Sequence, residues 1–399
     1  MNMSNQYIIQ PDLTFIDEVV SLGGDTLKKC FQCATCSVAC PIAPENSPFP
    51  RKEMIAAGWG LKDKLVGSAD IWLCHECGDC TALCPRGAKP GSTLSALRSY
   101  AINEYAGAAP VVGKLSKMVT NPQKLALLTA IPAVWLALMA FITMVLGKPG
   151  GIMDKIFHAV GVHWIHATDA PIAQARFISS WLVDFTFVPV FTASILVFVY
   201  TLKKMLNDMH ANAVAEGKTD KDTLDYKAYA KMIPVVLKKV LKHTQFNECG
   251  ENKNRGTAHM MVLYGFIGCF IVTSIGFFFL YILGVPGPYS QLWPFKWLGN
   301  ISGIAIVFGA VLMIKERLGK PDLNAYKDWY LLGLVLTLGA TGLLTQMARL
   351  AGMEFATYAI YYIHLIAVFH LFAYLPFSKL AHAVYRLAAM TYAEYANRK

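Results

Sequence analysis

The sequence predicts an all-α protein in two parts: a cysteine-rich helical domain over residues 1–117 and a bundle of six transmembrane helices over residues 118–399. Three observations predict this fold class. The 399-residue chain is 55% hydrophobic and only 16% charged, against about 25% charged residues in typical soluble domains. Long apolar runs dominate the chain from about residue 125 onward. Eight of the ten cysteines precede these runs, which indicates a separate N-terminal domain.

Two cysteine motifs with the same spacing lie in the N-terminal part. The first motif, residues 30–41, reads CFQCATCSVACP, and the second motif, residues 74–85, reads CHECGDCTALCP. This spacing is typical of two-cluster ferredoxins, in which the fourth cysteine of each motif binds the other cluster. We therefore expect two [4Fe–4S] clusters, one at Cys30, Cys33, Cys36 and Cys84, and the other at Cys74, Cys77, Cys80 and Cys40.

Zinc is the alternative occupant of the cysteine motifs. A zinc site usually takes two CxxC pairs around one ion, which leaves the third cysteine and the CxxxCP ending of each motif unexplained. The first residues, MNMSNQYIIQPDLTF, lack the basic and apolar regions of a secretory signal peptide. We therefore expect this part in the cytoplasm, where dense cysteines bind metal more often than they form disulfides. Cys249 and Cys269 lie outside the motifs, and Cys269 is expected to be a small packing residue.

Six apolar segments are each expected to cross a membrane. A spanning helix needs about 20 apolar residues, and most of the segments reach that length. Pro132 and Pro189 lie inside two of them, which is tolerated where neighbouring groups satisfy the freed carbonyls. The segments are about 125–146, 177–202, 258–283, 298–314, 328–348 and 355–376, and the fourth is the shortest.

The distribution of Lys and Arg predicts the orientation of the chain. With the N-terminal domain inside, all but five of the 36 Lys and Arg residues fall on the inner side. The five are Lys148, Lys155, Arg176, Lys296 and Arg349. Both termini should therefore face the cytoplasm across the inner membrane. The net charge of +10 is then an orientation signal, and no basic stripe with interleaved aromatics suggests nucleic acid. The charged loop 207–256 should contain an amphipathic surface helix.

Histidines in membrane segments are candidates for function by default. His364 and His382 are 18 residues apart, which places both on one helix face about 27 Å apart, a separation that suits two stacked hemes. His259, at the inner start of the third segment, shares its depth with His382. These two could be the axial ligands of one heme b. Alternatively, both are interfacial residues that reach toward water.

The outer half of the membrane part holds further candidates. His364 could bind a second heme if the outer loop supplies a ligand from His158, His163 or His166, although each of these also fits an ordinary surface histidine. His370 faces away from His364 and is expected to pack. A quinone site could form from Asp184, Gln346 and Arg349, which gather toward this side with Glu354. The alternative is an Arg349–Glu354 surface pair and a hydrogen-bonded Asp184 between helices.

The stretches KKCFQCATCSVACP and WLCHECGDCTALCPRGAKP resemble the C subunit of heterodisulfide reductases, over about residues 10–105. The resemblance implies a helical two-cluster ferredoxin domain. The disulfide-reducing partner in that family uses adjacent cysteines, and this chain has no Cys-Cys pair. Its clusters are therefore expected to conduct electrons without reducing a disulfide. Since no GxGxxG follows a strand pattern, the chain is not expected to bind its own flavin or nicotinamide.

The stretch HLIAVFHLFAYLPFSKLAH resembles the last helix of the nitrate reductase gamma family of diheme cytochromes b. AHMMVLYGFIGCF resembles helix two of that family and keeps its first histidine as His259. About ten residues further on, where the family has its second histidine, this chain has Cys269 or apolar residues. The second to sixth segments match the five family helices, and the first segment is an addition. The resemblance implies a six-helix transmembrane cytochrome b bundle.

The fusion of these two parts resembles the membrane subunits of the quinone-interacting membrane-bound oxidoreductases, the QmoC family. That resemblance implies menaquinone as substrate, heme b, and flavin and iron–sulfur partner subunits related to heterodisulfide reductase A, of the QmoA and QmoB type. It also implies a link to adenylylsulfate reductase in dissimilatory sulfate reduction. Two alternatives remain: a cytochrome b subunit of another heterodisulfide reductase-like or dehydrogenase complex, and a redox-sensing membrane anchor without quinone turnover.

Overall fold

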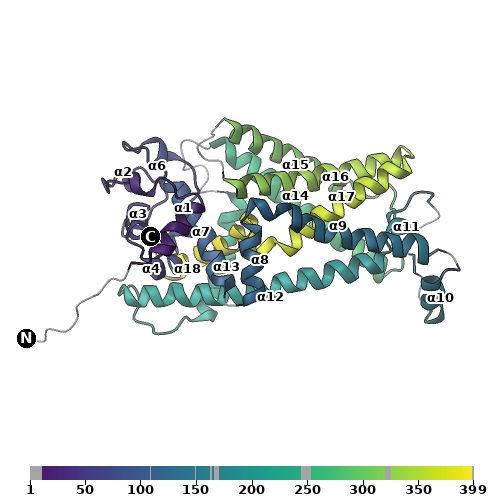
Figure 1. The fold of residues 1–399 in the computed structure, drawn as a ribbon, viewed down its shortest axis with the longest axis horizontal. Helices are drawn as coiled ribbons and strands as arrows, with labels where there is room; N and C mark the ends of the chain where they lie inside the picture. The colour runs from purple at the N-terminus through teal and green to yellow at the C-terminus, as the bar shows by residue number, and fades with distance from the viewer. Residues whose placement is uncertain are drawn as a thin grey trace, which may run out of the picture. The chain divides into compact units, whose positions relative to one another are not determined.

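The computed structural model describes residues 11–107, 109–148, 150–161, 164–165, 170–243, 253–319 and 325–397. Over these residues the chain is helical and has no strand, which confirms the predicted all-α class (Figure 1). The chain forms two compact units. Unit 1 comprises Met1–Thr120, Val197–Gly256 and Pro376–Lys399, and unit 2 comprises Asn121–Leu196 and Thr257–Leu375. The predicted domain boundary after residue 117 lies close to Thr120, where the first segment of unit 1 ends. Unit 1 also includes two later segments of the chain.

Unit 1 surrounds the cysteine motifs with short helices. Its largest buried side chains include Trp72, which stacks on Tyr385 with ring centroids 5.0 Å apart. The C-terminal segment therefore contributes to the core that supports the second motif. The helices are α1 (Leu13–Ser21), α2 (Thr35–Val38), α3 (Arg51–Gly58), α4 (Lys62–Val66), α5 (Asp70–Leu73), α6 (Asp79–Ala82), α7 (Pro90–Gly107), α8 (Pro110–Val119), α13 (Tyr226–Lys242) and α18 (His382–Tyr395), with the later part of α12.

Helix α13 is the amphipathic helix expected in loop 207–256. Asp225 caps its start by accepting hydrogen bonds from the amides of Lys227 and Ala228. The buried Tyr229 donates a hydrogen bond to the carbonyl of Ala388, and Lys239 pairs with Glu394 at 2.7 Å. Part of its apolar face is therefore covered by α18, within the same unit.

Among the residues that the structure describes, six helices are long and apolar enough to cross a membrane, and each coincides with one of the predicted segments. The fourth is longer than its sequence pattern indicated, with 25 residues. Few of their side chains are buried inside the protein, which suits helices whose outer faces contact lipid. The helices are α9 within Pro122–Leu146, α12 (Ser180–Ala215), α14 (Lys253–Tyr281), α15 (Pro294–Leu318), α16 (Tyr326–Leu350) and α17 (Glu354–Ala373).

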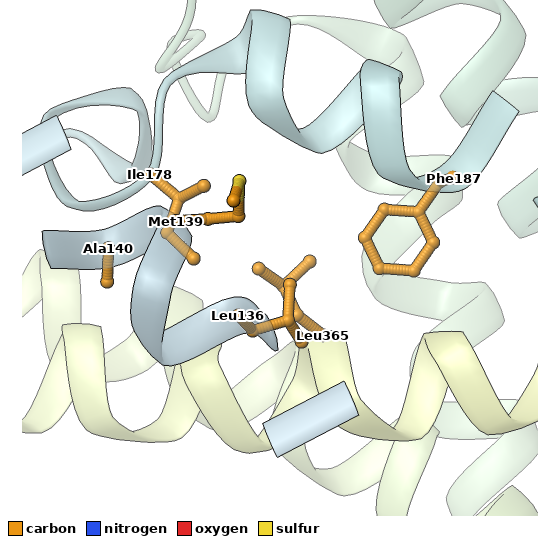
Figure 2. Close-up of a cluster of buried hydrophobic side chains, with 6 residues drawn as sticks. All are labelled: Leu136, Met139, Ala140, Ile178, Phe187 and Leu365. Atoms are coloured by element: carbon orange, nitrogen blue, oxygen red, sulfur yellow. The ribbon is translucent and has the colours of Figure 1, made fainter. Parts of the chain in front are cut away.

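Helix α9 (Leu125–Phe141) is packed into unit 2. Its Leu136, Met139 and Ala140 meet Ile178, Phe187 and Leu365 in a buried apolar cluster (Figure 2). Pro132 lacks the amide that would bind the carbonyl of Leu128, four residues earlier. The hydroxyl of Tyr374 donates to that carbonyl at 3.0 Å. A side chain from beyond α17 thus satisfies the group that the proline frees.

Helices α14, α15 and α16 approach one another through small residues. A Cβ added at Gly309 would lie 2.8 Å from the carbonyl oxygen of Ala258, and one added at Gly303 would lie 2.9 Å from the side chain of Leu343. Such close packing is typical of membrane helices, where dispersion contacts replace the hydrophobic effect as the source of association.

Candidate redox centres and a membrane cavity

The first cavity in unit 1 is lined by four cysteines, three from the first motif and one from the second. These are Cys30, Cys33, Cys36 and Cys84. The second cavity is lined by Cys40 from the first motif and by Cys74, Cys77 and Cys80 from the second. The structure thus brings together the two sets expected from the spacing. That each of these sets of four cysteines binds one cluster remains a prediction.

In both motifs, the residues on either side of the second cysteine have left-handed backbone conformations. Gln32 and Ala34 flank Cys33 with φ of 59° and 70°, and Glu76 and Gly78 flank Cys77 with φ of 54° and 99°. These left-handed conformations are unfavourable for residues other than glycine, and strain of this kind is typical of binding sites. Each loop can therefore curl around a cavity, as four converging thiolates require.

All of the thiols of both cavities except that of Cys33 are partly or fully withdrawn from solvent. Burial raises the pKa of Cys36 and of Cys40 to about 11, and it also raises the pKa of Cys80. At the exposed Cys33, a hydrogen bond with the Thr35 hydroxyl lowers the pKa. Buried thiols become thiolates when a bound cation compensates the charge. Four soft sulfur donors around one cavity fit an iron–sulfur cluster. Among the described residues, no three His, Cys, Asp or Glu side chains surround a position for a single metal ion.

The first cavity lies at an exposed surface of unit 1. Phe31 belongs to its lining and is 66% exposed, and two other apolar residues of the cysteine motifs, Val38 and Leu83, are 88% and 59% exposed. The guanidinium of Arg86 lies 4.0 Å from the centre of the Phe31 ring, and Arg51 Nε donates to the carbonyl of Gln32 at 2.9 Å. Exposed apolar side chains on these motifs, with two cations beside an exposed cysteine, are suited to contact with another protein.

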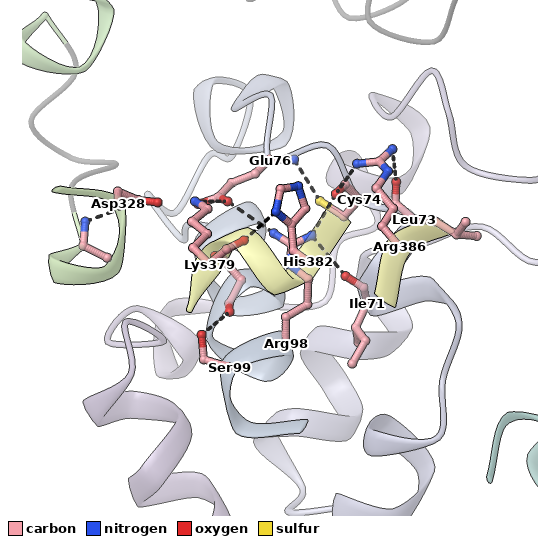
Figure 3. Close-up of polar contacts among 12 residues, drawn as sticks. Ile71, Leu73, Cys74, Glu76, Arg98, Ser99, Asp328, Lys379, His382 and Arg386 are labelled. Atoms are coloured by element: carbon pink, nitrogen blue, oxygen red, sulfur yellow. Dashed lines mark hydrogen bonds and ion pairs between the residues drawn. The ribbon is translucent and has the colours of Figure 1, made fainter. Parts of the chain in front are cut away.

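One buried cation and two partly buried cations contact the loop of the second cavity (Figure 3). Arg98 is 7% exposed and donates to the carbonyl of Cys74 at 2.8 Å. Lys379 forms an ion pair with Glu76 at 3.0 Å, and Arg386 donates to the carbonyl of Leu73 at 3.2 Å. Spacing along the sequence gave no signal for these cations, because two of them lie about 300 residues from the motif that they contact.

His382, the predicted heme ligand of unit 1, lies within this group of cations (Figure 3). Its Nδ1 is 2.6 Å from the carbonyl oxygen of Lys379. Because a carbonyl can only accept, Nδ1 carries the proton and Nε2 keeps its lone pair. Burial, followed by the charge of Arg98, lowers the pKa of His382 to about 3. A neutral imidazole with a fixed tautomer fits an axial heme ligand.

Two further histidines of the membrane segments, His364 and His370, lie in α17 of unit 2. His364 Nδ1 is 2.9 Å from the hydroxyl of Thr341, whose single proton goes to the carbonyl of Thr337. His364 therefore donates from Nδ1 and keeps the lone pair on Nε2. His370 is buried, and its Nδ1 meets the Tyr330 hydroxyl at 2.9 Å.

Three further histidine predictions have different outcomes. His259 lies in α14 of unit 2 and is partly buried. Its pairing with His382 stays a prediction. His158 is exposed in α10 (Ile152–Ala159). His163 and His166, the other proposed partners of His364, lie outside the described residues, as does Cys249.

The proposed quinone residues Asp184, Gln346 and Arg349 line one cavity of about 400 Å³ in unit 2. The cavity lies among the starts of α12, α15 and α17 and the ends of α14 and α16. In the sequence, Asp184 is at least 162 positions from Gln346 and Arg349, and the structure brings all three to one cavity. Volumes of this size are typical of small-molecule sites.

Two polar groups of this cavity are absent from the sequence-based set. The Tyr281 hydroxyl donates a hydrogen bond to the Asp184 carboxylate. Lys296 Nζ donates to Gln346 Oε1 at 2.6 Å, and Gln346 Nε2 donates to Asn300 Oδ1 at 2.7 Å. From the sequence, Lys296 is predicted only as an outer charge. Its place at the start of a spanning helix, level with Arg349, was a signal that could have included it.

Comparison with known proteins gives a separate match for each end of the chain. Residues 26–88 match the 4Fe-4S dicluster domain family, and residues 242–399 match the citrate utilization protein B family. The N-terminal part is a 4Fe–4S ferredoxin domain homologous to the C subunit of heterodisulfide reductases. The C-terminal part is similar to citrate utilization protein B. No solved structure gives a significant match.

Three relatives illustrate these similarities. The C subunit of the H(2):CoB-CoM heterodisulfide,ferredoxin reductase of Methanothermobacter marburgensis is 34% identical over 91 residues, which are 23% of this chain and 49% of the relative. A protein of Archaeoglobus profundus that is named as like the C subunit of heterodisulfide reductase is 35% identical over 89 residues, 22% of this chain and 47% of the relative. Citrate utilization protein B of Escherichia coli is 31% identical over 135 residues, 33% of this chain and 35% of the relative.

The chain spans about half the length of the heterodisulfide reductase subunits that it matches. Their similarity supports iron–sulfur clusters in the N-terminal domain. The six long apolar helices add that the protein is a multi-pass membrane protein.

Proposed function

We propose that the chain is the membrane electron-transfer subunit of a quinone-dependent oxidoreductase complex of the QmoC type. Electrons pass between menaquinone, heme b and two [4Fe–4S] clusters, and onward to flavin and iron–sulfur partner subunits of the QmoA and QmoB type. The complex serves adenylylsulfate reductase in dissimilatory sulfate reduction. The protein lies in the inner membrane with both termini in the cytoplasm.

The observation that carries the quinone assignment is the lining of the 400 Å³ cavity in unit 2. A quinone ring is apolar, and its two oxygens exchange protons as the ring exchanges electrons. The apolar part of the lining includes Phe277 and Leu280. Cationic and amide donors stand at Lys296, Arg349 and Gln346, and a carboxylate stands at Asp184. A few polar groups in a largely apolar cavity are typical of such sites.

The two sides of this cavity can do different chemistry. Lys296 and Arg349 can donate hydrogen bonds to a quinone oxygen and stabilise negative charge that develops on it. Gln346, held between Lys296 and Asn300, fixes the position of the lysine. The Tyr281–Asp184 pair can accept or supply a proton at the second oxygen, since a two-electron change of quinone also moves two protons.

Heme b would carry single electrons between the quinone and the clusters. His382 and His364 each keep a lone pair on Nε2, because Lys379 and Thr341 hold their Nδ1 protons. His259 would be the second ligand with His382. The residue that would share a second heme with His364 is not assigned. The residues of unit 1 that would hold the clusters are the four cysteines of each cavity.

The test of the quinone assignment is reduction of the intact protein by menadiol, followed through the absorbance of heme and clusters. Asp184→Asn should slow this reduction about 100-fold, within the usual range for loss of a proton-transfer group. Reduction by dithionite should keep its wild-type extent. Glu354→Gln is the matched control, because Glu354 is exposed and lies outside the cavity lining. If both variants react with menadiol like the wild type, the cavity is not the quinone site.

A second candidate function is favoured by the match of residues 242–399 to citrate utilization protein B. In this case the chain would pass electrons between the membrane and a dehydrogenase that oxidises a carboxylic acid. The redox-sensing anchor remains the third alternative. Identification of the subunits that co-purify with the intact protein distinguishes the first two candidates, and menadiol-driven heme reduction excludes the sensor.

A further inference from the structure

The two cysteine cavities of unit 1 have different electrostatic surroundings. We propose that Lys379, Arg386 and Arg98 are positioning residues that raise the reduction potential of the cluster held by Cys40, Cys74, Cys77 and Cys80, and that Glu76 limits this effect. The inference rests on the proposed function, since it takes the second cavity to hold a cluster. It adds a division of labour between two sites that have the same spacing of cysteines.

Arg98 supports the proposal through its burial and its contacts. It lies on α7, and its Nη1 donates to the carbonyls of Cys74 at 2.8 Å and Ile71 at 3.2 Å. Its Nη2 pairs with Glu76 at 3.2 Å. The guanidinium is therefore fixed against the backbone of the second motif, where solvent screens its charge little.

Lys379 and Arg386 bring two more positive charges from the C-terminal segment of the same unit. Lys379 pairs with the same oxygen of Glu76 that Arg98 contacts, at 3.0 Å. Arg386 donates to the carbonyl of Leu73 at 3.2 Å (Figure 3). It also donates to Nε2 of His75 at 2.5 Å. Two of these three cations pair with Glu76, and Asp79 adds a second, partly buried carboxylate to the lining of the second cavity. Three cations against two carboxylates leave an excess of one positive charge beside the loop that carries Cys74 and Cys77.

The first cavity lacks a comparable arrangement among the described residues. Its neighbouring cations, Arg51 and Arg86, are both exposed. Arg51 contacts the carbonyl of Gln32, which occupies the position in the first motif that Glu76 occupies in the second. Solvent screens charges at such a surface. The same cysteine spacing therefore occurs once beside exposed, screened cations and once beside cations that are buried or partly buried and less screened.

The physical consequence is a difference in potential. Adding an electron makes a cluster more negative, so nearby positive charge favours the reduced state and raises the potential. Burial strengthens each charge effect. The second cluster should therefore be reduced before the first, and the C-terminal segment, which also carries His382, supplies two of the three charges responsible.

The experiment is an EPR-monitored redox titration of the full-length protein with two opposite charge changes. Lys379→Gln removes a positive charge, and Glu76→Gln removes the negative charge next to it. Signals of the two clusters are assigned with Cys33→Ser and Cys77→Ser. Arg51→Gln, at the exposed first cavity, is the control. Iron and sulfide content is measured for every variant.

Lys379→Gln should lower the oxidised-to-reduced midpoint of the second cluster, and Glu76→Gln should raise it. Each shift should reach about a tenfold change in the ratio of the two states at a fixed potential, which is 59 mV for a one-electron couple. The double variant should return near the wild-type midpoint. Arg51→Gln should leave the second signal in place. Opposite signs from neighbouring residues distinguish a charge effect from structural damage, which has no reason to change sign.

Two results would overturn the inference. Shifts of the same sign in Lys379→Gln and Glu76→Gln, or a second cluster that stays at the wild-type midpoint in both, would show that the local charges do not set its potential. Arg386→Gln gives a further measure if Lys379→Gln loses iron. A wild-type protein without iron and sulfide would refute the proposed function as well, so the failures of the two proposals can be told apart.

Discussion

The hydroxyl of Tyr374 lies 3.0 Å from the carbonyl oxygen of Leu128, which Pro132 leaves without its helical donor. Tyr374→Phe should therefore lower stability by about 1 to 2 kcal/mol, because a buried carbonyl loses its partner. In a Pro132→Ala background the restored amide should remove most of that cost. Thermal unfolding of the four proteins in detergent gives the coupling.

Tyr362→Phe is the control for this coupling. The Tyr362 hydroxyl donates to the carbonyl of Ala133, which also has a helical donor in the regular part of α9. Its loss should cost the same with and without Pro132. An equal cost of Tyr374→Phe in both backgrounds would contradict the role assigned to Tyr374.

The exchange of cysteines between the motifs predicts which cluster each substitution disturbs. The intact protein should contain about eight iron and eight sulfide ions, as two [4Fe–4S] clusters require. Cys84→Ser should alter the EPR signal of the cluster at Cys30, Cys33 and Cys36, although Cys84 lies four residues after Cys80. Cys40→Ser should alter the other signal. Zinc without acid-labile sulfide would refute the cluster assignment.

His259 and His382 should hold the same heme. His259→Ala and His382→Ala should each remove one low-spin heme signal and block reduction of the clusters by menadiol, because both imidazoles are needed. The iron content of the clusters should stay at its wild-type value. His158→Ala, at an exposed histidine, is the control for heme spectroscopy. Full low-spin heme in both single variants would exclude the pairing.

Glu53 predicts a pH dependence of stability in unit 1. Glu53 and Asp70 are each 2% exposed and line a cavity of about 320 Å³, with Lys52 pairing to Asp70 at 2.7 Å. Burial and the neighbouring Asp70 carboxyl raise the pKa of Glu53 well above 4.5. The folded state thus prefers the protonated acid. The resulting stability is complete below the unfolded pKa and is lost as the pH rises through the folded pKa.

Glu53→Gln should consequently stabilise the protein above the folded pKa of Glu53 and have little effect near pH 4. The gain should be about 1 kcal/mol or more, the scale of one pKa unit. Thermal unfolding between pH 4 and pH 8, compared with the exposed Glu45→Gln, measures it. A gain that is constant across this pH range would mean that ionisation of Glu53 is not its source.

The six spanning helices were predictable because each depends on a local run of apolar residues. The two four-cysteine sets were also predictable, since their spacing alone encodes the exchange of the fourth cysteine. Asp184, Gln346 and Arg349 could be grouped because the alternating direction of successive helices places the helix ends that carry them on the same side of a membrane. In all three cases the information lies within one segment, or in the order of the segments.

The remaining residues depend on contacts that no local pattern encodes. Lys379 meets Glu76 across 303 positions, and Arg386 meets Leu73 across 313. Tyr281 reaches Asp184 from another helix. The apolar face of α13 was visible in the sequence, but a periodic pattern does not say what covers that face, and part of it packs on α18. Such pairings are fixed by the packing of whole segments.

The crossed sharing of cysteines has a consequence for how the protein is made. Cys40 belongs to the cavity of the second motif, and Cys84 belongs to the cavity of the first. During synthesis, the set that includes Cys40 is complete only at Cys80, and the set that includes Cys84 is complete four residues later. Under the ligation proposed above, the first motif alone therefore cannot complete a cluster, and both clusters wait for the second motif. Each finished cluster would also link residues of one motif to the other. Loss of one cluster would therefore weaken the hold of the two motifs on the remaining cluster.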